Sequence, residues 1–267
     1  MVHARLNQVH HARKPSGGAA PGEVAGYADV RRYGSKGGQD GDNHAIRHVP
    51  RYHDIVIEGE QSDGVLTLQS GWAFRYRLLG DGRRHIIDFL VPGDLVAPLS
   101  HMASHFVAAL TDCTVRRHAS GDLTELARVN FRLAEALQEG VAREMTRLLE
   151  KTVSLGRRNA KERMASLLIE VYQRTRQAGA AGDGWFRFPV TQELLADALG
   201  LSIVHVNRTL RALREDGLVH MASGRVAVHD LEALMDLAGA GDGDGLGDLV
   251  AAAERPSVSA ARGASTP

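Results

Sequence analysis

The chain has 267 residues, of which 43% are hydrophobic, and this suits two modest domains, each with a core, and tails. Its 32 basic and 32 acidic side chains cancel, which excludes a protein whose overall field attracts nucleic acid, so any basic surface must be local. No stretch is long and apolar enough to cross a bilayer and the N-terminus lacks the apolar core of a signal peptide, so we expect a cytoplasmic protein that binds no membrane.

The first part of the chain, residues 1–50, is rich in glycine, histidine and charge. Gly17-Gly18 and Gly37-Gly38 interrupt any periodic pattern, and such a composition buries too little apolar surface to offset the entropy lost on ordering. We therefore expect residues 1–50 to form a flexible segment.

Residues 51–119 show a different pattern, in which short apolar runs alternate with turn residues such as Gly80-Asp81-Gly82 and Pro92-Gly93-Asp94. Such runs predict strands, and several short strands at near-regular spacing are typical of a jelly roll or barrel rather than of a parallel sheet. The expected strands lie at residues 54–57, 65–68, 72–76, 86–89 and 106–110.

Residues 120–155 predict one long helix, because Leu, Ala, Glu and Arg dominate and no glycine occurs between Asp122 and Glu139. Residues suited to a helix seam recur at steps of three and four, which is the spacing of a supercoiled pair and predicts a homodimer. The alternative, packing on the chain's own roll, is expected for the earlier residues Leu123, Leu126 and Phe131. The seam consists of Ala134, Leu137, Val141, Met145, Leu148, Thr152 and Leu155.

Residues 156–238 are expected to form a further domain. Its first helix is predicted to include residues 161–172 and to end near Gly179-Ala180-Ala181-Gly182. Gly156 is the expected hinge before it, because a glycine between two helices is the position least costly to bend. The buried stripe of this helix is predicted to run through Met164, Leu167, Leu168 and Val171.

The stretch from Thr191 to Leu210 predicts two short helices joined at a glycine. Thr191 is placed to cap the first helix, and Gly200 to end it in the left-handed conformation. Ser202 can cap the second helix, whose apolar face leaves its polar residues more exposed. The pattern is typical of a helix-turn-helix, although a plain pair of packed helices would show it too. The apolar face of the second helix consists of Val206, Leu210 and Leu213.

A hairpin signal follows the second short helix. The turn Ala222-Ser223-Gly224-Arg225 separates two short apolar runs, and two helices followed by a hairpin favour a winged helix-turn-helix over a plain helical pair. Residues 239–267 predict a flexible tail. Within it, Asp242-Gly243-Asp244-Gly245 is similar to the start of a calcium loop, but the glutamate of its twelfth position is missing, so we expect no metal there.

Two parts of the chain resemble the Crp/Fnr family of bacterial transcription regulators. The sequence PVTQELLADALGLSIVHVNRTLRALREDGLV, which contains both predicted short helices, is similar to the DNA-binding domain of proteobacterial members. Upstream, the run from Gly71-Trp72 to Gly93-Asp94-Leu95 is similar to the family's sensory β-roll. The resemblance covers about residues 51–238.

The resemblance implies an α+β fold with three parts: an N-terminal jelly roll or β-roll like a cyclic-nucleotide-binding domain, a long dimerisation helix, and a C-terminal winged helix-turn-helix domain. It also implies a sequence-specific transcription regulator rather than an enzyme. Such a protein binds palindromic promoter DNA as a homodimer, receives its signal through the β-roll, and has RNA polymerase as a partner.

Seven residues are predicted to contact DNA. Arg208 is the predicted base reader, because a guanidinium can bond two acceptors of guanine at once and the family's groove-reading arginine matches this position. The other six are Ser202, His205 and Asn207 for bases or phosphates, Thr191 and Gln192 where a helix N-terminus meets a phosphate, and Arg211 for phosphate.

The resemblance also implies that the target sequence differs from that of the best-known members. Those members carry an acidic residue and an arginine early in the second helix, where this chain has Val204 and Ile203. An aliphatic side chain cannot accept a hydrogen bond from cytosine, but it can touch a thymine methyl group. We expect a palindrome with half-site centres about one helical turn apart.

The sequence leaves the effector unidentified and predicts no cofactor or metal. Cyclic-nucleotide binders of the family use a Gly-Glu pair and a following Arg-Ser/Thr, whereas Gly93-Asp94 here has no arginine after it through His101, so cyclic AMP is not expected. Cys113 alone cannot build a four-thiolate iron–sulfur cluster, and we expect it to be a strand side chain rather than a redox thiol. His101 and His105 suit a metal only on a helix, and their surroundings predict a loop.

Two other functions stay open at this point. A cupin-like metal protein or enzyme could be built on the β-roll, although residues 51–119 contain neither a tight His/Glu set nor a Ser/His/Asp arrangement. A regulator that binds DNA constitutively without a ligand is the second, because the phosphate-binding arginine is missing and the N-terminal segment departs from the family.

Overall fold

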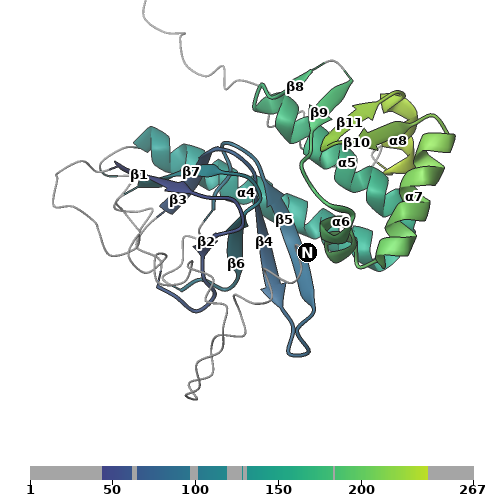
Figure 1. Cartoon of the computed structure of the whole chain (residues 1–267). Helices are drawn as coiled ribbons and strands as arrows, with labels where there is room; N and C mark the ends of the chain where they lie inside the picture. Colours follow the sequence, from purple (N-terminus) through teal and green to yellow (C-terminus); the bar gives the residue numbers. More distant parts are fainter. Residues whose placement is uncertain are drawn as a thin grey trace, which may run out of the picture. The chain divides into compact units, whose positions relative to one another are not determined.

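The computed structural model describes residues 44–61, 65–96, 102–118, 128, 131–182 and 184–239 (Figure 1). The chain divides into two compact units: one takes in the chain up to Glu150 together with Phe188–Ser202, and the other takes in Lys151–Arg187 and the chain from Ile203 onward. Most of the two segments predicted to be flexible, 1–50 and 239–267, lies outside the described residues: residues 1–43 and 240–267, the latter with the calcium-like stretch. Within the described ranges, every helix is too short or too polar to traverse a bilayer.

The first unit contains two antiparallel sheets, as predicted for a β-roll. One has the strand order β2-β6-β4-β5 and the other β1-β7-β3. The strands are β1 (His44–Val49), β2 (Asp54–Val56), β3 (Val65–Ser70), β4 (Ala73–Leu78), β5 (Arg84–Leu90), β6 (Phe106–Ala109) and β7 (Cys113–His118).

The N-terminal boundary of the roll corrects a prediction. Residues 44–49 were expected to belong to the flexible segment, but they form β1, which pairs with β7 from His44↔His118 to Val49↔Cys113. This strand depends on a partner about seventy residues away, whose backbone groups it satisfies, so the local composition does not reveal it.

The two sheets share one apolar core. Its buried side chains come from both sheets and from the segments between the strands, and include Val49, Ile55, Leu68, Ala73, Leu90, Val96, Val107 and Val115. Gly71, between β3 and β4, allows the chain to turn beside this core: its φ is +88°, and a Cβ there would lie 2.3 Å from the carbonyl oxygen of Asp112. Only glycine fits this position.

A buried polar contact lies in the β2-β6-β4-β5 sheet. The hydroxyl of Tyr76 donates a hydrogen bond of 3.1 Å to Oδ1 of Asp54, and the Tyr76 ring stacks on Phe106. Burial raises the pKa of Asp54 to about 6, against the opposing effect of the Tyr76 hydrogen bond. The fold therefore favours the protonated form of this carboxyl group.

The long helix α4 (Phe131–Arg157) confirms the predicted helix from residue 131 onward and corrects its hinge. Gly156 lies inside α4, and the break comes at Arg158-Asn159, before α5 (Ala160–Gln177). Asn159 explains the position of the break, because its Oδ1 accepts from the backbone N–H groups of Lys161 and Glu162 while Glu162 accepts from the N–H of Asn159. This capping box fixes where α5 begins, whereas glycine only permits a bend.

The second unit packs helices on a four-stranded sheet with the order β10-β11-β9-β8. The turn Ser223-Gly224 joins β10 to β11 with φ values of 50° and 71°, the type I′ geometry, so the predicted hairpin is confirmed. Strands β8 and β9 were not predicted, because they are too short to leave a periodic pattern. The elements are α5, β8 (Ala181–Gly182), β9 (Trp185–Arg187), α7 (Ile203–Glu215), β10 (Val219–Ala222), β11 (Arg225–Val228) and α8 (Leu231–Leu237).

Gly71→Ala is expected to lower the free energy of unfolding by roughly 2–4 kcal/mol, because the new methyl group would overlap a backbone carbonyl. Gly82→Ala is the matched control: it has the same positive φ, at +86°, but open space around it, so it should cost only about 1 kcal/mol. Urea denaturation of both variants measures the difference, and equal losses would show that backbone conformation alone explains Gly71.

Asp54→Asn is expected to stabilise the protein at pH 7 by roughly 1–3 kcal/mol, since the amide can still accept from Tyr76 but carries no charge to bury. The folded pKa of Asp54, about 6, lies above its ordinary value of 3.8. Its contribution is therefore fully present below the lower value and is lost as the pH rises through the higher one. Unfolding free energies measured across this range should converge at the acidic end. Parallel curves for the two proteins would contradict the assignment.

Candidate nucleic-acid interface

Helix α7 has one buried and one polar, exposed face. Val206 and Leu213 are fully buried and Leu210 is half-buried, largely as predicted. Thr209 is also buried, which its polarity did not predict, and its hydroxyl donates a 2.8 Å hydrogen bond to the carbonyl of His205 in the preceding turn. This internal bond lets a polar residue join the buried face.

The exposed face of α7 carries cationic and polar side chains. Val204, Asn207, Arg208 and Arg211 are exposed and recur at helical spacing, so they share one side of the helix. His205 is half-buried and lies at the edge of this face. The structure therefore brings together three of the predicted DNA-contacting residues.

The two arginines on this face differ in their electrostatic environment. Nε of Arg211 donates a 2.7 Å hydrogen bond to Oε1 of Glu215, which raises the pKa of Arg211. Glu215, the last residue of α7, was not among the residues that the sequence indicated for this face. Arg208 has no ion-pair partner in the part of the chain that the structure describes. Its charge is the less compensated of the two.

The remaining predicted contacts, Thr191, Gln192 and Ser202, belong to the other compact unit. Thr191 caps α6 (Gln192–Leu199): its hydroxyl accepts a 3.2 Å hydrogen bond from the N–H of Leu194, as predicted. Gln192 is exposed in the first turn, and Gly200 ends the helix with the predicted left-handed φ of 65°. Ser202 is exposed immediately before α7.

Helix α6 lies against β5 in this unit, an arrangement that the sequence did not indicate. Asp197 accepts hydrogen bonds from Nε and Nη2 of Arg84 at 2.9 and 2.6 Å, and the Arg84 side chain is almost fully buried. The Phe188 ring, just before α6, lies 5.2 Å from Phe89 edge to face and 5.6 Å from Trp72. These partners are far apart in the chain, so no local pattern links them.

The proposed metal and redox candidates of the roll are mostly buried groups. Cys113 opens β7, as predicted for a strand residue, and burial raises its pKa to about 11, so it stays a thiol. Burial, together with nearby Arg75 and Arg77, lowers the pKa of His105 to about 4, so it stays neutral. His101 lies outside the described residues.

Helix α4 exposes an apolar stripe. Met145 and Leu149 are 59% and 61% exposed, and Val141 and Val153 continue the stripe one turn before and after them. Of the predicted seam, Leu148 and Leu155 are half-buried and Thr152 is exposed, while the side chains of Ala134 and Leu137 lie outside the description.

Phe131, at the start of α4, corrects a prediction. It was expected to pack on the roll together with Leu123 and Leu126, which lie outside the described residues, but it is 69% exposed. An apolar residue in a helical pattern indicates that some surface covers it, not which one.

Known proteins match both parts of the chain. Residues 46–130 match the family described as the cyclic nucleotide-binding domain, and residues 162–237 match the Crp-like helix-turn-helix domain. The transcriptional activator protein FnrL of Cereibacter sphaeroides is 31% identical over 72% of this chain and 79% of its own length. The nitrogen fixation regulation protein FixK of Rhizobium meliloti is 31% identical over 69% of this chain and 82% of its own.

A solved structure agrees with these sequence relatives. FixK2 from Bradyrhizobium japonicum superposes with a TM-score of 0.65 and 26% identity, covering 73% of this chain and 96% of its own. Three findings agree: the order of roll, long helix and helix-turn-helix, the two family matches, and the identity across most of both chains. The chain therefore belongs to the Crp/Fnr family and is a transcription regulator of that type.

Proposed function

We propose that this regulator binds a palindromic promoter site as a homodimer, with α7 of each copy in the major groove. The observation that carries the proposal is the exposed face of α7, on which Arg208 has no acidic partner among the described residues. A buried face of Val206 and Leu213 fixes the opposite side of the helix to its own unit. The arginines are then available to an external polyanion.

In this proposal some residues of α7 contact bases and others contact phosphates. Arg208 reads a guanine in the groove, since a planar guanidinium matches the two acceptors on its edge. Arg211, already engaged with Glu215, contributes charge to phosphate binding rather than base reading. Val204, which is 76% exposed, is suited to a thymine methyl group. The other polar contacts in the proposal are Ser202 just before α7, His205 and Asn207 in its first turns, and Thr191 and Gln192 at the start of α6.

We infer that the occupant of the exposed stripe on α4 is a second copy of the chain. Exposed Val141, Met145, Leu149 and Val153 form a continuous apolar strip on a helix of 27 residues, and such a strip is costly to leave in water. In a two-fold symmetric dimer each copy would present its own α7 to one half-site of a palindrome, and the half-site centres would be about one helical turn apart.

Further parts of the proposal rest on the family. FnrL is named a transcriptional activator, which supports RNA polymerase as a partner and a role in the cytoplasm, where promoter DNA is found. We propose a regulator without catalytic activity, metal or cofactor, whose signal enters through the roll. Neither cyclic AMP nor an iron–sulfur cluster is part of the proposal.

Arg208→Ala is expected to reduce discrimination between the operator and altered duplexes by about 1–3 kcal/mol, because a base contact is lost. Arg211→Ala serves as the comparison: it should weaken binding to all duplexes alike and lower the salt slope by about one unit. Titrations of selected operator and random duplexes at several salt concentrations separate the two behaviours. Equal losses on operator and random DNA for Arg208→Ala would show that another residue reads the base.

The double substitution Met145→Glu and Leu149→Glu is expected to produce monomers at micromolar concentration, because a seam would have to bury two carboxylates from each copy. Sedimentation velocity measures the change, and operator affinity should fall with it. Met145→Leu, which keeps the apolar surface, is the control and should remain dimeric. A wild-type protein that sediments as a single chain at the same concentration would refute the assigned occupant.

A further inference from the structure

A buried arginine connects the roll to the long helix. Arg75, on β4, is only 4% exposed, and the register places it opposite Val107, a core residue of β6. Its Nη1 donates to Oε1 of Glu144 on α4, and its Nη2 donates a 3.0 Å hydrogen bond to the carbonyl of Leu95. One guanidinium thus ties together a strand, the segment after β5 and the long helix.

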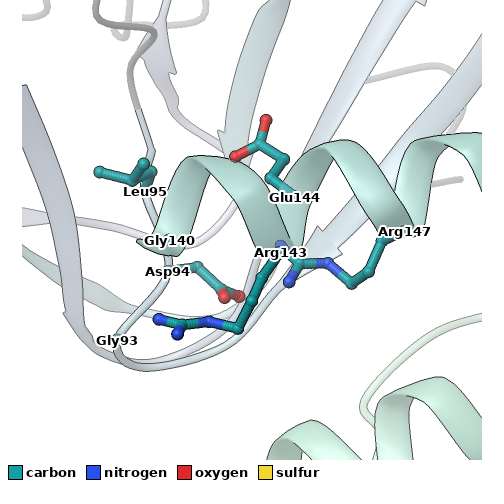
Figure 2. Close-up of a pocket in the computed structure, with 7 residues that line it drawn as sticks. All are labelled: Gly93, Asp94, Leu95, Gly140, Arg143, Glu144 and Arg147. Carbon is teal, nitrogen blue, oxygen red and sulfur yellow. The ribbon is translucent and has the colours of Figure 1, made fainter. Parts of the chain in front are cut away.

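The helix approaches the roll closely at this point. A Cβ added to Gly140 of α4 would lie 3.8 Å from the Leu95 side chain, which is ordinary van der Waals contact. Figure 2 shows Gly140, Arg143, Glu144 and Arg147 of α4 around the turn that holds Gly93, Asp94 and Leu95. Arg75 and Glu144 therefore meet where the two elements are already in contact.

The space left at this contact is small. The pocket that these seven residues line has a volume of about 60 Å³. Pockets for drug-sized ligands and nucleotides are typically about 300–1,000 Å³. The carboxylate of Asp94 is also engaged, because its Oδ2 accepts a 2.7 Å hydrogen bond from the N–H of Val91. As it stands, the pocket admits water-sized molecules rather than a nucleotide.

Because Arg75 is charged and buried, its stability depends on the position of Glu144 on α4. A buried guanidinium without an anion beside it is strongly unfavourable, so the position of Glu144 and the burial of Arg75 stabilise each other. Other groups face Arg75 from the roll itself: Asp88 lies opposite it on β5, and His105 stays neutral. Glu144 is the acidic residue by which α4 contacts Arg75.

We propose that Arg75 is a positioning residue that seats α4 on the roll through Glu144 and Leu95, so that this contact needs no anion from outside the chain. This inference rests on the proposed function, since it concerns how the roll sets the helix that pairs two copies. Operator binding then needs no small anion.

Chemical rescue tests the proposal. The side-chain group that Arg75→Ala removes corresponds to ethylguanidinium, so this small molecule can fill the space left by the substitution. Operator affinity of the variant should fall by about tenfold, equivalent to about 1.4 kcal/mol. Added ethylguanidinium should restore most of that affinity, whereas ethylammonium and sodium chloride at the same concentration should not. Wild-type affinity should be unaffected by ethylguanidinium, cyclic AMP or inorganic phosphate. A purely structural role would lower the melting temperature without such specific rescue.

The helix side of the pair provides a second route, which also serves if Arg75→Ala fails to fold. Glu144→Gln keeps the shape of the side chain and should weaken operator binding by about tenfold, with no rescue by ethylguanidinium. Arg143→Gln, on the adjacent residue and paired with exposed Glu139, is the matched control and should stay within about twofold of wild type.

The outcomes separate this inference from the proposed function. Folded Arg75→Ala or Glu144→Gln protein with wild-type operator affinity would overturn the inference and leave DNA binding intact. Wild-type protein that binds its operator only when cyclic AMP or phosphate is added would overturn it as well. Wild-type protein that prefers no duplex under any of these conditions would instead refute the proposed function.

Discussion

The orientation of α7, the helix proposed to read DNA, depends on the burial of one side of it. Val206, Thr209 and Leu213 are withdrawn from water, and α7 packs against α5 and β10 of its own unit. Rotation of the helix about its axis would expose apolar surface and bury guanidinium groups, both at high cost. The buried face therefore determines that the arginines on the opposite face point toward solvent.

The cost of burying a guanidinium group also shapes the roll, but there the arginines are buried and paired instead of exposed. Arg75 and Arg84 project from β4 and β5 into surroundings almost without water, and each has a carboxylate from a helix beside it, Glu144 and Asp197 respectively. A buried ion pair adds little net stability compared with an apolar pair, but it strongly disfavours any arrangement in which the partners separate. Such pairs therefore fix the position of α4 and α6 on the strands more than they strengthen the fold.

Much of the fold could be predicted because its signals are local. Thr191 caps α6, Gly200 ends it in the left-handed conformation, and Ser223-Gly224 forms the hairpin turn, each by a rule that involves a few neighbouring residues. Where local signals compete, the stronger hydrogen-bonding signal prevailed: α5 begins after the Asn159 capping box, and Gly156 remains helical. The helix-turn-helix and the exposed arginines of α7 follow from patterns of this kind.

The sequence by itself determined the order of roll, long helix and helix-turn-helix, the family and the cationic face of α7, because periodicity, caps and turns depend on adjacent residues. The tertiary structure alone decided that His44–Val49 is a strand, that Phe131 is exposed, and that Arg75 meets Glu144. Each of these depends on which distant segment covers a given residue. Hydrogen bonding and burial between segments 64 or more residues apart leave no periodic trace in either segment.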